Sequence, residues 1–213
     1  MRVTKYEHAA LVVEEAGHTL VVDPGSFTRP LGDTAHVDAV VVTHAHPDHW
    51  TPVQLAALRA ANPDVPIFGP AGVVEALAGE NITATTITDG ETVEVGAFTL
   101  LFAGTTHAVI HASIPVIDNT GVLVNGTLFY PGDAFTVPAF PVAVLAAPVG
   151  APWLKISEAM DYITAVKPGT SFPVHDQTLS AAGFAMHADR LKAATEAVGG
   201  TAVVLQPGDS LDA

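Results

Sequence analysis

Short apolar runs separated by polar turns dominate the chain, and most of these runs have the length and alternation of strands. At the start, three valine-rich segments predict strands joined by turns: residues 2–7, 9–15 and 18–23. The run at 39–42 is apolar throughout, which is typical of a strand with both faces buried. After it, apolar residues at helical spacing predict a helix over 51–62, which ends before Pro63.

The pattern changes in the middle of the chain and then becomes regular again. The next part predicts a helix at 71–78 and four short strands at 66–68, 82–85, 92–95 and 99–103. Between 113 and 130 we expect three further strands, with hairpin turns at 118–120 and Asn125-Gly126. The remainder alternates, with strands at 142–146, 170–174 and 202–205 and helices at 157–166 and 181–198. This order predicts a mixed α/β fold, with helices outside two packed sheets, in a single domain over 1–213.

The hydropathy of the chain is high, yet it does not predict a membrane span. Mean hydropathy is +0.39, and the longest uncharged stretch is 137–154. Four prolines interrupt this stretch, and each one removes a backbone donor, so we expect loops around a buried strand. Charges are scattered through the first 17 residues, unlike an export signal. We therefore expect a cytoplasmic protein that makes no membrane contact.

Charge and composition narrow the possible partners and the possible chemistry. The chain has 213 residues, of which 49% are hydrophobic, so it can bury a large core. Its 22 acidic and 8 basic residues give a net charge of −14, which would repel nucleic acid. Because cysteine is absent, a metal site must use His, Asp, Glu or water. Ten histidines are available for such a site.

The segment that follows the buried strand carries the strongest chemical signal. It reads His44-Ala45-His46-Pro47-Asp48-His49, which places four metal-ligand side chains within six positions. Three imidazoles and a carboxylate at the end of an apolar strand are costly to desolvate, whereas a dication offers each a strong partner. His44 and His46 are two apart and point the same way from an extended backbone, while Asp48 and His49 can reach a second ion.

This segment resembles the metallo-β-lactamase superfamily, whose signature is a strand followed by H-x-H-x-D-H. The resemblance implies a four-layer αββα sandwich and one or two metal ions that activate water at the sheet ends. It also implies three later ligands: a histidine after a strand, a bridging aspartate and a histidine near the C-terminus. His107 fits the first of these by following the strand at 99–103 closely, and His111 is the alternative. Asp133 and His175 fit the other two.

The resemblance therefore implies a dinuclear centre. His44, His46 and His107 would hold the first ion, and Asp48, His49 and His175 the second. Asp133 and a hydroxide would be shared between the two ions, and Asp48 or Asp133 would help orient the hydroxide and take its proton. Zinc is the default metal, while Mn²⁺, Fe²⁺ and Ni²⁺ also suit such ligands.

Residues around this centre are also candidates for support or substrate contact. Asp23 stands where the superfamily often has an aspartate beneath the ligands, and it would fix a histidine tautomer. His8 resembles the Gly-His-Ser histidine of the cytoplasmic branch that includes ascorbate-6-phosphate lactonase, although Glu7 and Ala9 flank it here. Further candidates for a contact with the metal ligands or with the substrate are His111, Trp153, Lys155, Arg29 and Trp50.

Three functions agree with these residues. The first is a metal-dependent hydrolase of a small-molecule ester, lactone or phosphodiester. The second is an iron redox enzyme of the same fold, and the third is a metal-binding protein without turnover. The expected partner is a small molecule, and the sequence leaves the oligomeric state open.

Overall fold

The computed structural model describes residues 1–31 and 34–213, and its strands form two sheets. The first sheet has the order β14 (Ser210–Asp212), β1 (Arg2–Lys5), β2 (Leu11–Glu15), β3 (His18–Val22), β4 (Val37–Val41), β5 (Ile67–Gly69) and β6 (Thr85–Thr86). The second has the order β13 (Thr201–Ala202), β12 (Thr170–Val174), β11 (Val144–Pro148), β10 (Leu128–Tyr130), β9 (Gly121–Val124), β8 (Phe98–Ala103) and β7 (Thr92–Val95).

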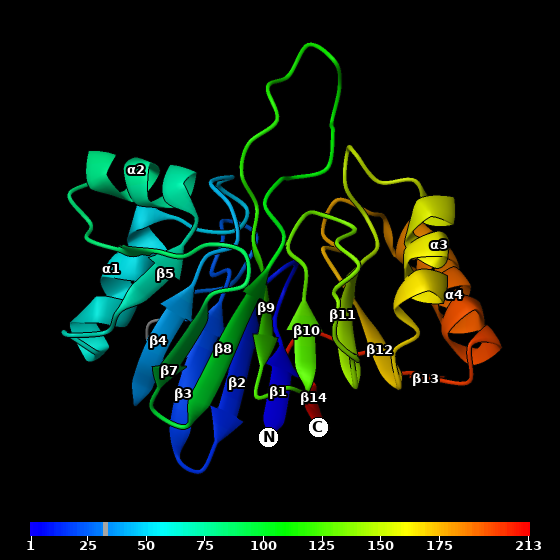
Figure 1. Ribbon diagram of the computed structural model, residues 1–213, viewed down its shortest axis with the longest axis horizontal. Helices are drawn as coiled ribbons and strands as arrows, with labels where there is room; N and C mark the ends of the chain where they lie inside the picture. Colours follow the sequence, from blue (N-terminus) through cyan, green and yellow to red (C-terminus); the bar gives the residue numbers. More distant parts are fainter. Residues whose placement is uncertain (32–33) are drawn as a thin grey trace.

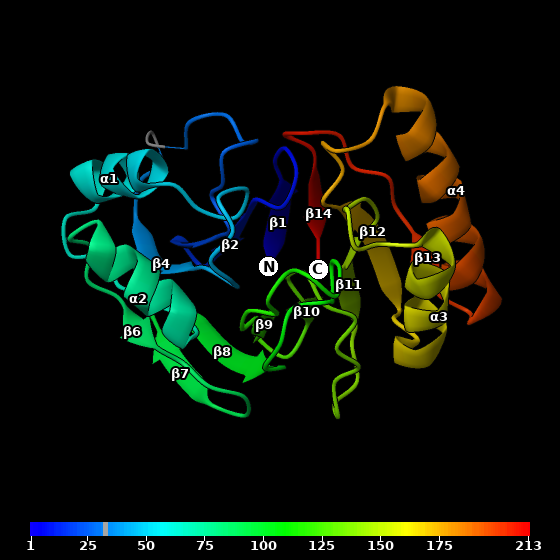
Figure 2. The ribbon, with the colours of Figure 1, turned by 90° about the horizontal axis from the view of Figure 1, so that it is seen from above.

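Helices cover the outer face of each sheet, which gives four layers (Figure 2). The helices are α1 (Pro52–Ala61), α2 (Ala71–Gly79), α3 (Ile156–Val166) and α4 (Ala181–Ala197). Alternate side chains of the strands meet between the sheets, where Leu11 and Leu20 join Phe102 and Val122 in one core. Separate apolar clusters lie under the helices of each side. The predicted αββα sandwich is therefore confirmed.

Strand direction brings one end of many strands to the same edge. In the first sheet, β3, β4 and β5 run parallel, and β1 has the same direction because β2 is antiparallel to both β1 and β3. In the second sheet, β10, β11 and β12 run parallel, and β8 shares their direction. The loops that follow these strands gather at the upper edge in Figure 1.

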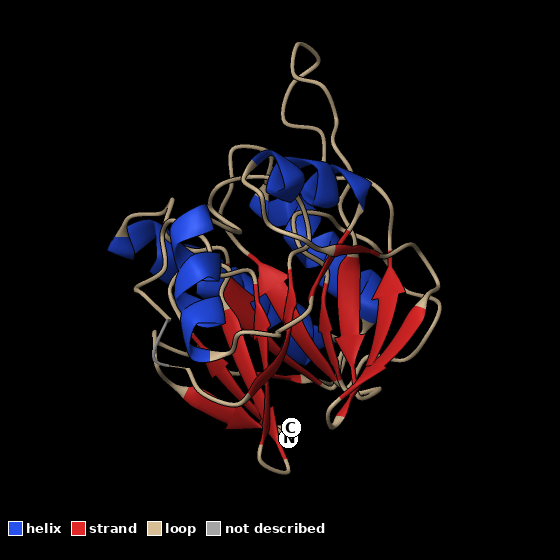
Figure 3. Ribbon diagram, turned by 90° about the vertical axis from the view of Figure 1, so that its left-hand side faces the viewer, coloured by secondary structure: helices blue, strands red, loops and turns tan. Residues whose placement is uncertain are grey.

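The helices and most strands lie close to their predicted places, and three predictions need correction. The segment 113–130 forms two strands, β9 and β10, in place of three. Their turn at Asn125-Gly126 is confirmed, since φ is 50° and 64° there, as a type I′ turn requires. Residues 104–120 form instead a long loop that projects beyond the sheets (Figures 1 and 3). Its apolar side chains Ile114 and Val116 are exposed, so their alternation does not reflect a buried strand face.

The other corrections concern short elements at sheet edges. The strand predicted at 82–85 is reduced to β6, and the one at 202–205 to β13. Strand β14 was not predicted, because its three residues carry too little apolar pattern, and it is stabilised by antiparallel pairing with β1. None of the described helices is long and apolar enough to cross a membrane.

Candidate metal centre

The loops at the upper edge bring together side chains from five strand ends. His8 follows β1, the segment from His44 to His49 follows β4, and His107 follows β8. Asp133 and His175 follow β10 and β12. Potential ligand atoms of these residues form three overlapping groups, in each of which all atoms lie within 4.8 Å of one another.

The first group is His44, His46 and His107. Each pair of these three rings has a centroid distance of 4.8 Å. His44 and His107 are buried, and His46 is half-buried. These three histidines are the set that the sequence assigns to the first ion. The structure thus brings His107 to this group, whereas His111 lies exposed on the projecting loop, where its Nδ1 contacts the Ser113 hydroxyl.

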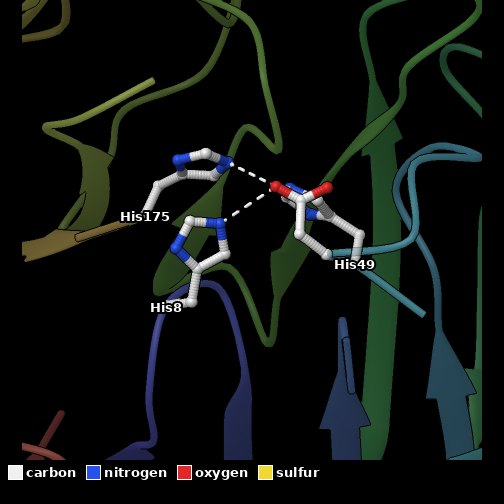
Figure 4. A group of neighbouring side chains, drawn as sticks. His8, His49 and His175 are labelled. Atoms are coloured by element: carbon white, nitrogen blue, oxygen red, sulfur yellow. Dashed lines mark hydrogen bonds and ion pairs between the residues drawn. The ribbon is translucent and has the colours of Figure 1, made fainter. Parts of the chain in front are cut away.

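The second group contains Asp48, His49 and His175 together with His8. Asp48 Oδ2 lies 3.4 Å from His175 Nε2 and 4.0 Å from His49 Nε2. Figure 4 shows His8 and His175 directed at one carboxylate oxygen, which is this Oδ2 atom. The set that the sequence assigns to the second ion is therefore assembled, with His8 added.

Asp133 lies between the two groups. Its Oδ1 is 3.3 Å from His49 Nε2, and its Oδ2 is 3.4 Å from His107 Nε2 and 3.1 Å from His175 Nε2. One carboxylate thus faces histidines of both groups. This position suits a bridging ligand, because two neighbouring dications need an anion between them.

The inner nitrogens and one inner oxygen of this cluster are buried without any hydrogen-bond partner. They are Nε2 of His44, His49, His107 and His175, and Oδ1 of Asp133. A buried polar atom without a partner costs about 1–3 kcal/mol, and buried polar groups in proteins are normally satisfied. Five such atoms in one place are therefore a strong signal for a ligand that the side chains themselves do not supply.

The outer nitrogens of three of these histidines all face oxygen acceptors. Nδ1 of His49 lies 2.6 Å from Asp23 Oδ2, that of His107 lies 2.5 Å from the Ala108 carbonyl, and that of His175 lies 2.5 Å from the Gly150 carbonyl. Donation of Nδ1–H to these oxygens leaves the lone pair of a neutral ring on Nε2. A hydrogen bond from the outer ring nitrogen to an oxygen is typical of metal-binding histidines, so the donor set fits divalent ions.

Residues 2–175 match the model of a family described as the beta-lactamase superfamily domain. The chain belongs to this superfamily. Among its relatives, the Mycobacterium tuberculosis protein Rv0786c is 37% identical over 82% of this chain and 84% of that protein. A UPF0173 metal-dependent hydrolase of Carboxydothermus hydrogenoformans is 26% identical over 84% of this chain and 85% of that protein.

Solved structures share the fold of this superfamily chain. Igni18, a metallo hydrolase of Ignicoccus hospitalis, superposes with a TM-score of 0.76 at 19% identity and covers 99% of this chain and 97% of its own. CmlA, a diiron β-hydroxylase of Streptomyces venezuelae, gives a TM-score of 0.74 at 16% identity, over 99% of this chain and 53% of its own. The predicted superfamily and fold are therefore confirmed. At these sequence identities, the similarity to solved structures shows the fold alone.

Asp23 and Trp153 contact residues of the cluster from outside. The carboxylate of Asp23 is fully buried and accepts hydrogen bonds from the Thr43 backbone, the Thr43 hydroxyl and His49. Trp153 Nε1–H donates to Asp133 Oδ2 at 2.8 Å. Both residues therefore lie beside the cluster, as expected for candidates for ligand support or substrate contact.

The loop before Asp133 requires a glycine at position 132. Gly132 has φ of 65°, and a Cβ there would collide with Asn119 Oδ1 and with Thr43. Asn119 Oδ1 accepts the Asp133 backbone N–H at 3.0 Å, and its amide donates to the Pro131 carbonyl. Asn119 was missed from the sequence because it lies fourteen positions before Asp133 with no motif around it.

Lys155, Arg29 and Trp50 do not join the cluster. Lys155 is exposed at the N-terminus of α3, and Arg29 is exposed and paired with Glu7. Trp50 is buried in the apolar cluster beneath α1. Among the described residues, these three candidates for substrate contact therefore lie outside the groups of potential metal ligands.

Charges in the cluster are strongly coupled. Burial lowers the pKa of His44 well below its ordinary value. Burial acts the same way on His175, but Asp133 and Asp48 outweigh it and raise the pKa of His175 from 6.5 to about 9. Burial opposes ionisation of Asp133, yet His49 and His175 lower its pKa well below its ordinary value. The metal-free cluster therefore combines cationic histidines with anionic aspartates at neutral pH.

We predict that zinc binding releases protons and strengthens as the pH rises toward about 9. His175 must lose its proton before its Nε2 can bind zinc, and its pKa is raised from 6.5 to about 9 in the metal-free protein. Calorimetric zinc titrations in buffers of different ionisation enthalpy measure the protons released. Affinity that stays constant between neutral pH and about 9, with no proton release, would contradict zinc binding at His175.

Proposed function

We propose that this superfamily chain is a hydrolase of a small-molecule ester, lactone or phosphodiester that works with two divalent ions, zinc by default. The five buried, unpartnered atoms of the cluster carry this proposal. His44, His46 and His107 would hold one ion, Asp48, His49 and His175 the other, and Asp133 would contact both. Such a pair of ions lowers the pKa of water and polarises a substrate oxygen. The relatives named metal-dependent hydrolases support this activity.

The two inner carboxylates have different surroundings, which suits different tasks. Asp133 is 4% exposed and is held by the Trp153 N–H, so it serves as a fixed anionic bridge. Asp48 is 24% exposed, and although burial opposes its ionisation, the neighbouring His175 and the hydrogen bond from His8 lower its pKa. Asp48 therefore stays ionised, and it is the inner carboxylate that an approaching substrate reaches.

The surroundings of the cluster favour a neutral and partly apolar substrate within this class. Phe27 is 50% exposed and packs edge-on against His8 at 5.0 Å. Phe135 packs against Trp153 at 5.1 Å. Of the basic residues near these loops, Lys5 is paired with Asp176 and Arg29 with Glu7. A remote anionic group on the substrate would therefore meet few free cations and a chain of net charge −14.

An iron redox enzyme is the second candidate function. The cluster consists of histidine and carboxylate donors alone, and such donors also suit iron. The diiron hydroxylase CmlA shows that the same fold serves this chemistry in another protein. Iron in the purified protein together with oxygen consumption, and no hydrolysis with restored zinc or manganese, would favour this candidate.

We predict that Asp133→Ala abolishes hydrolysis and lowers the metal content while the protein stays folded, because it removes the carboxylate shared by both groups. Asp209→Ala is the matched control, since Asp209 occupies a similar Pro-Gly-Asp turn and is exposed. Elemental analysis, circular dichroism and a screen of chromogenic esters, lactones and phosphodiesters measure the result. Unchanged hydrolysis in Asp133→Ala would contradict the assigned bridge.

We also predict that a neutral ester or lactone is cleaved with a higher kcat/KM than its analogue with a carboxylate far from the scissile bond. The physical reason is the shortage of free cations near the cluster. The test compares matched substrate pairs for the wild type and for Lys155→Ala. Preference for the anionic analogue, lost in Lys155→Ala, would contradict this substrate class and identify Lys155 as an anchor.

A further inference from the structure

His8 lies at the second group of ligands and, by distance alone, resembles a further ligand. It is fully buried in the turn between β1 and β2. Its ring centroid is 3.8 Å from that of His175 and 6.1 Å from that of His49. Figure 4 shows the three rings around one carboxylate oxygen, with His8 and His175 joined to it by dashed lines.

The hydrogen bonds of His8 set it apart from the histidines that fit a metal. Its Nδ1 lies 3.2 Å from the backbone nitrogen of Gln177, which donates to it. A backbone N–H can only donate, so Nδ1 carries the lone pair and the ring proton is on Nε2. Nε2–H then donates to Asp48 Oδ2 at 3.1 Å. This is the reverse of His49, His107 and His175, in which Nδ1 faces an oxygen.

We infer that His8 is a positioning residue that donates Nε2–H to Asp48 Oδ2 and holds this carboxylate for the second ion, and that it is not itself a ligand. The inference rests on the proposed metal centre and assigns His8 a role within it. Nε2 of His8 also differs from the inner nitrogens of the ligands in having a hydrogen-bond partner.

Three consecutive residues after β12 fix His8 in this state. The His175 N–H donates to the His8 carbonyl at 2.7 Å, Asp176 Oδ1 accepts the His8 N–H at 3.1 Å, and the Gln177 N–H binds the ring. Asp176 is itself paired with the buried Lys5 at 2.7 Å. The segment 175–177 thereby maintains the left-handed backbone of His8, whose φ is 62°.

The same contacts keep His8 neutral. A protonated ring would place an Nδ1–H against the N–H of Gln177, and both groups would be donors. Burial also lowers the pKa of His8, which favours the neutral ring. Because His175 belongs to the same segment, one short stretch of chain positions two of the rings that face Asp48 Oδ2.

Imidazole ¹⁵N NMR tests the tautomer without any activity measurement. In the metal-free and the zinc-loaded wild type, we expect His8 to show a protonated Nε2 and a bare Nδ1. The rings of the proposed ligands should change their nitrogen shifts when zinc is added. A metal-type shift of His8 Nε2 on zinc addition, or a proton on Nδ1 in the metal-free protein, would overturn the inference.

Variants test the positioning role. His8→Asn tolerates the left-handed backbone but lacks a donor at the place of Nε2, so the affinity for the second zinc ion should fall by about 10–100-fold. His8→Gln reaches that place with an amide N–H and should restore most of the affinity. His18→Asn is the control. His18 begins β3, its Nδ1 lies 2.9 Å from Asp38 Oδ1, and it faces none of the proposed ligands.

Zinc titration monitored by calorimetry, with folding checked by thermal melting, separates the outcomes. The positioning role would be overturned if His8→Asn and His8→Gln lost affinity for the second zinc ion equally. It would also be overturned if both variants kept the wild-type affinity. Absence of zinc binding in the wild type would contradict the proposed function itself. Zinc binding with His8 Nε2 among the ligands would contradict this inference alone.

Discussion

The structure depends on one constraint, which is the placement of five buried polar atoms that make no hydrogen bond within the protein. Four imidazole nitrogens and one carboxylate oxygen lie together and are buried. Their desolvation costs free energy that the rest of the fold must offset, unless a cation provides the missing partner. The fold also fixes which nitrogen of each ring faces the cluster. The Nδ1 atoms of His49, His107 and His175 are already hydrogen-bonded to oxygen, so only Nε2 is free to bind a cation.

Backbone conformation at the strand ends reflects the same constraint. His8, Asp23 and His175 have φ of 62°, 48° and 59°, which is left-handed backbone that residues other than glycine seldom adopt. Such strain costs about 1–3 kcal/mol at each position and is often found at functional sites. Each backbone is held by a specific contact: Asp23 N–H donates to the Val41 carbonyl, and His175 N–H donates to the His8 carbonyl. The sheets thus stabilise a cluster that local preferences disfavour.

Much of the fold and the first part of the cluster could be predicted from local patterns in the sequence. His107, Asp133 and His175 were predicted only through the resemblance to the superfamily, because no local motif marks them. Helical spacing and valine-rich runs place the helices and long strands, and the ligands after β4 stand within six positions. The projecting loop at 104–120 could not be predicted, since its exposed Ile114 and Val116 alternate as in a strand. The role of His8 was equally hidden, because its tautomer is fixed by Gln177, which lies 169 positions away in the chain. Long-range contacts of single polar atoms leave no local pattern.

The most direct test of the account is anomalous diffraction from crystals of the zinc-loaded protein, recorded on both sides of the zinc absorption edge. We predict two anomalous peaks within the cluster. One should lie among Nε2 of His44 and His107 and the side chain of His46, and the other beside Asp48, His49 and His175. Asp133 should lie between the peaks, and His8 should keep its contact with Asp48. Zinc bound only at the surface, with the five inner atoms still unpartnered, would contradict the account.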